Sequence, residues 1–151
     1  MSTRGQFDDL LRDIEPSPTV PALVEGLRDT DQGVRLLAAR ALEQLEAVAV
    51  PAQIPALIVA VGDRDLCVRR VAMRMLGQMG PNASAAVPAL ISAVQDAYEE
   101  VRSAAARALG QIGQVAMSAL PALTEAETSD TNVQVREQAA WAIRTIRGDQ
   151  V

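Results

Sequence analysis

The sequence predicts an all-α protein, an α-solenoid of four stacked helix pairs, because two short motifs recur along it with one period. The tripeptide Pro-Ala-Leu begins at four prolines spaced 34, 33 and 33 residues apart: Pro21, Pro55, Pro88 and Pro121. The dipeptide Val-Arg begins at four valines spaced 34, 33 and 34 residues apart: Val34, Val68, Val101 and Val135. Two independent markers with the same spacing indicate an array of units of about 33 residues.

Each unit is predicted to begin with a short amphipathic helix at its proline. Apolar residues stand one before, two after and six after the proline, which is one face of a helix. In the first three units they are Val20, Leu23, Leu27; Ile54, Leu57, Val61; and Val87, Leu90, Val94. Proline suits a first helical turn because its missing N–H has no partner to lose there.

A second amphipathic helix of about 15 residues is predicted from each Val-Arg onward. In the middle two units its apolar residues are Val68, Ala72, Met75, Leu76, Met79 and Val101, Ala105, Ala108, Leu109, Ile112. Asp31 and Asp65 precede this helix in acidic connectors and are expected N-caps. Gly80 and Gly113 are expected to end the helix, and the earlier glycines Gly77 and Gly110 to permit close helix packing.

Composition argues against catalysis and against nucleic-acid binding. The formal charge is −5, and all 14 basic residues are arginines, so a broad basic surface for nucleic acid is not expected. The absence of histidine removes the commonest general base and zinc ligand. We therefore predict no enzyme activity, no bound metal and no cofactor. Cys67 is the single cysteine, so no intrachain disulfide can form. A reactive thiol at Cys67 stays an alternative to a tolerated small side chain.

Nothing in the sequence predicts a membrane segment or a secretory signal. The N-terminus has acidic residues where a signal peptide needs an apolar core. The longest apolar stretch, residues 47–61, is interrupted by prolines and is too short to span a bilayer. A cytoplasmic protein is expected, and arginine without lysine is typical of a GC-rich bacterial genome.

The repeat pattern L-x-x-[AG]-[LV]-x-D-x-D-x-x-V-R-x-x-A-x-x-[AM]-L-G-x-[MI]-G resembles the HEAT family, specifically its phycobilisome-lyase-like bacterial branch. The match runs from about residue 19 to 147 and is closest at LIVAVGDRDLCVRRVAMRMLGQMG. The resemblance implies a right-handed α-α superhelix. It also implies a ladder of ion pairs between repeats, formed by an aspartate six residues before each arginine: Asp29/Arg35, Asp63/Arg69, Asp96/Arg102 and Asp130/Arg136.

We expect a single domain with repeats at about 19–53, 54–86, 87–119 and 120–148. Residues 1–18 are expected to form a capping helix and a linker, the linker being residues 15–19. The capping helix is indicated by Phe7, Leu10, Leu11 and Ile14, which lie at i, i+3, i+4 and i+7. The alternative for this helix is docking to a partner or to a second copy.

The terminal repeats depart from the glycine pattern of the middle two. The first repeat has Glu43 and Glu46 where the middle repeats have glycine, and the last has Arg144 and Arg147. End repeats of a solenoid need polar outer faces because no neighbour covers them. These residues therefore indicate a complete small array.

The exposed face of each second helix can be predicted from the helical angle. At about 100° per residue, the sixth and tenth residues after the Val of Val-Arg point away from the core. Stacking would align them as two columns: Arg40, Arg74, Arg107, Trp141 and Gln44, Gln78, Gln111, Thr145. Arginine and tryptophan are common at binding hot spots, and glutamine can bond to a peptide backbone.

The predicted partner-binding residues on this concave face are Arg40, Gln44, Arg70, Arg74, Gln78, Arg107, Gln111 and Trp141. The function predicted from them is a non-catalytic scaffold or adaptor that binds an acidic or carboxylate-bearing segment of another protein. Repetition that merely keeps the helices soluble is the simpler reading of the same columns. The family resemblance implies a different function, a bilin lyase-type or chaperone-like subunit for phycobiliprotein chromophorylation. A regulatory subunit of an enzyme is a third possibility.

Overall fold

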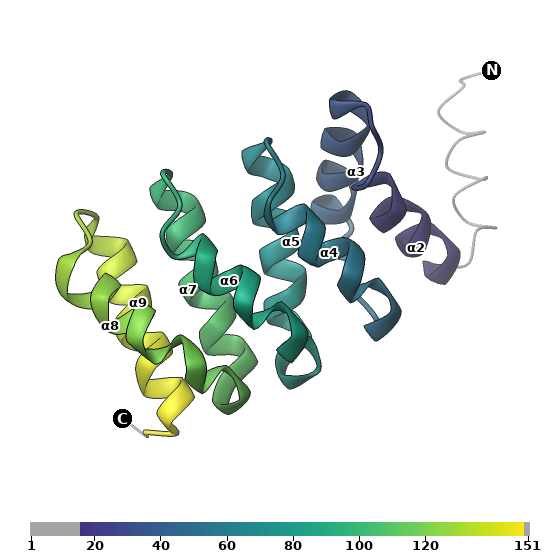
Figure 1. Cartoon of the computed structure of the whole chain (residues 1–151). Coiled ribbons are helices and arrows are strands. Elements are labelled where there is room, and N and C mark those ends of the chain that lie inside the picture. The colour runs from purple at the N-terminus through teal and green to yellow at the C-terminus, as the bar shows by residue number, and fades with distance from the viewer. Residues whose placement is uncertain (1–15, 150–151) are drawn as a thin grey trace, which may run out of the picture.

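A computed structural model describes residues 16–149, and within them the chain is helical with no strand (Figure 1). The helices form four pairs in a row: α2 (Pro16–Gly26) with α3 (Gln32–Gln44), α4 (Ile54–Val61) with α5 (Leu66–Gln78), α6 (Val87–Ala93) with α7 (Glu99–Ile112), and α8 (Leu120–Ser129) with α9 (Val133–Arg147). Short 3-10 helices, η1 (Pro51–Gln53), η2 (Gly80–Ala86) and η3 (Gly113–Ala119), connect successive pairs. The predicted all-α solenoid is confirmed. The expected capping helix, with Phe7, Leu10, Leu11 and Ile14, lies outside the described residues.

The first helices begin where their prolines predict, except in the first repeat. Helices α4, α6 and α8 each begin one residue before the proline of Pro-Ala-Leu. Helix α2 instead begins at Pro16, so the expected linker over residues 15–19 is wrong for Pro16–Thr19, which are helical. Pro16 and Pro18 fall in the first turn, where a missing backbone N–H costs no intrahelical bond, and so they do not prevent helix formation.

The second helices of the first two repeats begin directly after the predicted aspartate caps, about two residues before Val-Arg, and the predicted glycines follow the ends of α5 and α7. The Asp31 carboxylate accepts a hydrogen bond from the Gly33 amide at 2.7 Å, and that of Asp65 accepts one from the Cys67 amide at 2.8 Å. These contacts satisfy amides of the first turn that have no intrahelical partner. At the other end, Gly80 and Gly113 adopt φ values of 60° and 85°, which a residue with a side chain rarely adopts.

Small residues let the second helices of successive repeats approach closely. A Cβ atom placed on Gly77 of α5 would lie 3.1 Å from the Cα of Ala108 on α7. A Cβ on Gly110 of α7 would lie 3.0 Å from the Cα of Ala142 on α9. The predicted apolar positions of these helices are buried beside this contact, with Met79 half-buried. The core is therefore a continuous layer of aliphatic side chains that passes from repeat to repeat.

The ion-pair ladder implied by the family resemblance is present, and Arg35, Arg69 and Arg102 each reach the aspartate of the following repeat. The pairs are Arg35 Nε to Asp63 Oδ2 at 2.7 Å, Arg69 Nη1 to Asp96 Oδ2 at 2.6 Å, and Arg102 Nε to Asp130 Oδ2 at 2.8 Å. Arg102 also donates to the backbone carbonyl of Asp96 in its own repeat, at 3.0 Å. Arg35 likewise donates to the backbone carbonyls of Asp29 and Thr30, so Arg35 and Arg102 each tie two neighbouring connectors together.

The last pair of the ladder shifts the pKa of both groups. Burial raises the pKa of Asp130, but hydrogen bonds from the Arg102 side chain and the Asn132 amide, with the charges of Arg102 and Arg136, lower it below its ordinary value. The hydrogen bond to Asp130 raises the pKa of Arg102. The charged pair is thus favoured in the folded chain.

The polar outer face expected for the first repeat is wrong for Glu43. Its carboxylate pairs with Arg70 of α5 at 3.3 Å, so Glu43 lies on the side of α3 that faces the second repeat. Its equivalents Gly77 and Gly110 likewise face the following repeat. At the other end of the array, Arg144 and Arg147 are exposed, as predicted. Within residues 16–149, no helix is long and apolar enough to cross a membrane.

Candidate functional site

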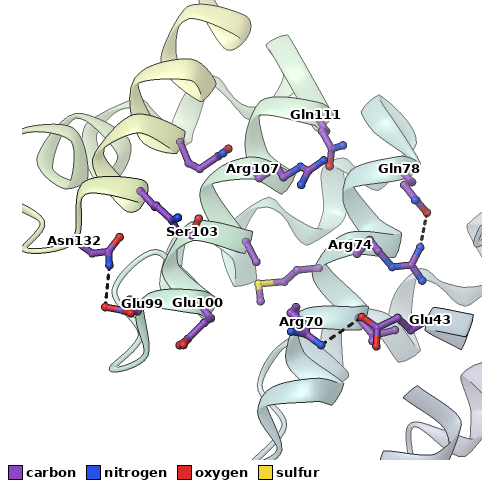
Figure 2. Close-up of a pocket in the computed structure, with 15 residues that line it drawn as sticks. Glu43, Arg70, Arg74, Gln78, Glu99, Glu100, Ser103, Arg107, Gln111 and Asn132 are labelled. Carbon is purple, nitrogen blue, oxygen red and sulfur yellow. Dashed lines mark hydrogen bonds and ion pairs between the residues drawn. The ribbon is translucent and has the colours of Figure 1, made fainter. Parts of the chain in front are cut away.

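A groove with a volume of about 520 Å³ runs across the second helices α3, α5, α7 and α9 (Figure 2). We call it the second-helix groove. Its lining includes five of the eight predicted site residues: Arg70, Arg74, Gln78, Arg107 and Gln111. The other three, Arg40, Gln44 and Trp141, are exposed but do not line it. The stacking therefore brings together the predicted residues of the second and third repeats.

Arg74 is held in place by two contacts. One guanidinium nitrogen donates to the Gln78 side chain at 3.2 Å, and the other donates to the backbone carbonyl of Leu42 on α3 at 3.3 Å. The Nε atom is buried with no hydrogen-bond partner among the described residues. The Leu42 carbonyl also accepts from the Ala47 amide at 3.0 Å, so Arg74 adds a second hydrogen bond near the end of α3 while its charge lies at the edge of the groove.

Arg70 and Arg107 differ in how their charge is balanced. Arg70 pairs with Glu43, and both side chains are about half exposed, so the pair stabilises the fold only slightly. Arg107 is exposed, and no ion pair or hydrogen bond joins its side chain to a described residue. Figure 2 shows Arg107 and Gln111 of α7 across from Arg74 and Gln78 of α5. Arg107 is thus a groove cation without a counter-charge among the described residues.

The sequence analysis missed the acidic end of the groove. Glu99 and Glu100 at the start of α7 line it, and the side-chain amide of Asn132 donates to Glu99 at 2.9 Å. Glu100 immediately precedes Val101, so its helical angle falls between those of the two predicted columns. Extending the angular reading from Arg107 by about two turns toward the helix start would have found it. The groove therefore has an arginine-and-glutamine part and a glutamate part.

Trp141 packs within the solenoid. A Cβ atom on Gly110 would collide with the indole ring, so the ring lies directly over the backbone of α7. Gln111 lies over Gly77 of α5 in the same manner. The glycine at this position in the two middle repeats therefore receives a side chain from the next repeat. Trp141, which is 37% exposed, takes part in this packing.

Solved structures with similar folds were found. One is the complex of CpcE and CpcF of phycocyanin lyase from Nostoc sp. PCC7120, at 24% identity and a TM-score of 0.66, covering 83% of this chain and 85% of that one. Another is a designed armadillo repeat protein in complex with the peptide (KR)4, at 23% identity and a TM-score of 0.67, covering 84% of this chain and 64% of that one. A third is an engineered protein, at 25% identity and a TM-score of 0.67, with 84% and 63% covered.

The chain spans less than two thirds of the length of the engineered and designed proteins that it resembles. No curated protein matches it. The family model described as HEAT repeats matches residues 20–86 and 54–144, which together include the four helix pairs. The helix pairs, the arginine–aspartate ladder and this match agree, and the chain belongs to the HEAT-repeat family.

Proposed function

We propose that the chain is a non-catalytic protein-interaction scaffold that binds a carboxylate-bearing segment of a partner protein in the second-helix groove. The observation that carries the proposal is the state of Arg107. The ladder arginines Arg35, Arg69 and Arg102 are each paired with an aspartate, whereas Arg107 faces the groove without such a pair among the described residues. A carboxylate could receive two parallel hydrogen bonds from its guanidinium.

The neighbouring groups suit an extended segment. Gln78 and Gln111 are exposed in the same part of the groove, and their side chains can both donate to and accept from a peptide backbone. Arg74 adds positive charge from a fixed position. The designed armadillo protein in complex with the peptide (KR)4 has a similar fold, which supports a solenoid of this kind as a peptide-binding frame.

Absence of catalysis is part of the same proposal. The chain has no histidine, and no group of three or more histidine, cysteine, aspartate or glutamate side chains within residues 16–149 is arranged to hold a metal ion. The groove is lined by arginine, glutamine and glutamate side chains, without a paired nucleophile and base. These groups support binding.

The test compares proteins captured from native lysate by the wild type, Arg107→Glu and the matched control Arg144→Glu. Arg107 alone is changed because Arg74 also donates to the Leu42 carbonyl, and its replacement would disturb α3. Arg144 is exposed on α9 and does not line the groove. Mass spectrometry should identify a protein that the wild type and Arg144→Glu retain and Arg107→Glu loses, with unchanged helicity and melting in all three. If every captured protein survives Arg107→Glu, the groove is not the site.

A second candidate function is a lyase-type or chaperone-like subunit for bilin attachment to phycobiliproteins. It is supported by the similar fold of one chain in the complex of CpcE and CpcF, of which this chain covers 85%. Mixing the protein with a free bilin and recording the visible spectrum tests this function. A shift in absorbance supports a bilin-binding subunit, whereas an unchanged spectrum favours the protein-binding scaffold.

A further inference from the structure

The side of α3 that begins the described solenoid carries an uncovered apolar face. Val34, Leu37 and Leu45 are 41%, 67% and 56% exposed. They lie on one side of α3, at spacings of three and eight residues. We call these three residues the α3 face.

Most equivalent positions in the later repeats are buried, and the exceptions, Met79, Ala104 and Gln138, are half-buried. Val68 and Val71 of α5, the equivalents of Val34 and Leu37, are 0% and 1% exposed, and Ile112, which matches Leu45, is 0% exposed. In those repeats a preceding second helix packs on the same side. Val34 and Leu45 therefore occupy core positions of the repeat pattern, and Leu37 lies at the edge of that core. All three lack the preceding second helix that packs on this side in the later repeats.

The opposite end of the array is polar. Arg144 of α9 stands at the repeat position of Gly77 and Gly110, the position that faces the following repeat. Arg144, Glu137 and Arg147 are all exposed. The C-terminal end is thus suited to water, whereas the α3 face has the composition of a buried contact.

We propose that residues 7–14 dock on the α3 face as an amphipathic helix, in the place that a preceding second helix would occupy. The segment carries Phe7, Leu10, Leu11 and Ile14 on one helical face. Only Glu15 separates it from Pro16, where α2 begins, so it is at high local concentration beside α3. The inference is independent of the function proposed for the second-helix groove.

The dimensions of the two surfaces agree. Gly26, at the end of α2, lies against Ala38 at the middle of α3, and the chain then returns to the start of α3 at Gln32. The start of α2 therefore lies toward the Leu45 end of α3. Ile14 is two residues before Pro16 and lies within about 7 Å of it by chain length. In a helix Phe7 would be about 10.5 Å from Ile14 along the axis, and Leu37 is about 12 Å from Leu45.

The agreement in length fixes the direction of residues 7–14 relative to α3. With Ile14 beside Leu45 and Phe7 toward Leu37, the docked segment runs parallel to α3. The helices α3, α5, α7 and α9 also run parallel to one another (Figure 1). The segment would therefore continue the row of second helices by one member.

The first experiment is crosslinking between introduced cysteines in a Cys67→Ser background. Ile14→Cys with Leu45→Cys is treated with a short bis-maleimide, and the products are mapped by peptide mass spectrometry. The control is Ile14→Cys with Val59→Cys, because Val59 is 64% exposed on α4, away from the α3 face. The expected product is an intrachain crosslink for the Leu45 pair, independent of protein concentration and much weaker for the Val59 pair. Interchain crosslinks would assign the face to a second copy, and equal yields for both pairs would show no docking; either result overturns the proposal.

The second experiment is hydrogen exchange of the full chain, and it does not depend on a crosslink. Amides of residues 7–14 should exchange at least about tenfold more slowly in the wild type than in Leu37→Asp. Val59→Asp, which adds the same charge at a similarly exposed residue, should retain the protection. Fast exchange of residues 7–14 in the wild type would overturn the proposal.

Discussion

Replacing Asp130 with asparagine should separate the fourth repeat energetically from the third. The Asp130 side chain is only 8% exposed, and its carboxylate accepts from Arg102 at 2.8 and 3.1 Å and from the Asn132 amide at 2.9 Å. Asparagine keeps the size but has one acceptor oxygen, and its amide group would face a guanidinium that can only donate.

The cost follows from what is left behind. The Arg102 side chain is 15% exposed, so Asp130→Asn leaves a largely buried cation without its counter-charge. Removing one partner of a buried pair costs about 3–5 kcal/mol. Arg102 keeps its bond to the Asp96 carbonyl, and both groups retain some contact with water, so we expect a loss of about 2–4 kcal/mol in the free energy of unfolding.

Hydrogen exchange locates this loss, because in a solenoid each repeat contacts only its neighbours. Amides of α8 and α9 should exchange about 100-fold faster in Asp130→Asn, which corresponds to about 3 kcal/mol, while those of α3 should be unchanged. The control is Asp149→Asn, which removes an exposed carboxylate beyond α9 and should change stability by less than about 0.5 kcal/mol. If the two variants behave alike, the ladder does not stabilise the junction between these repeats.

Three more predictions concern acid stability, glycine packing and the core. The pKa of Asp130 is lower in the folded chain than in the unfolded chain, so its stabilising contribution is full above about pH 5 and is lost as the pH falls below about 4. In urea unfolding across this range, the free energy of unfolding should fall more for the wild type than for Asp130→Asn. Gly110→Ala should lower the melting temperature, because the new methyl group would collide with Trp141 and the Ala142 backbone. This collision costs about 1–3 kcal/mol, more than the roughly 1 kcal/mol gained in helix propensity. Gly77→Ala should lower the melting temperature less, since the end of the flexible Gln111 side chain can move away. Leu109→Ala should lower the free energy of unfolding in urea by about 2–5 kcal/mol, because Leu109 is 0% exposed. Val59→Ala should lower it by less than about 0.5 kcal/mol. Equal losses would contradict the assigned core.

The parts of the fold that recur in every repeat could be predicted from the sequence. Buried apolar positions return at the helical period, and the caps Asp31 and Asp65 use local geometry, so a single unit contains both signals. These signals within a single unit do not show which side of a second helix meets the next repeat. Glu43 was therefore placed on the outer face, although it contacts Arg70.

The groove was predictable only in part, for a related reason. The angular reading found Arg74 and Arg107, because exposure depends on helical phase. It could not find the bond from Arg74 to the Leu42 carbonyl, which depends on a rotamer and on the end of a neighbouring helix. The angular reading also could not show that Trp141 packs on Gly110, since that contact joins different positions of two repeats.

Because each ladder arginine binds the aspartate of the following repeat, the two ladder residues of one unit serve different neighbours. Duplication or deletion of a whole unit anywhere inside the array conserves the number of charge partners at every junction. Loss of a single ladder residue, by contrast, leaves a charged residue of the adjoining unit without its ion-pair partner. Such a chain can change its length by gene recombination more easily than it can change one of these residues by point mutation.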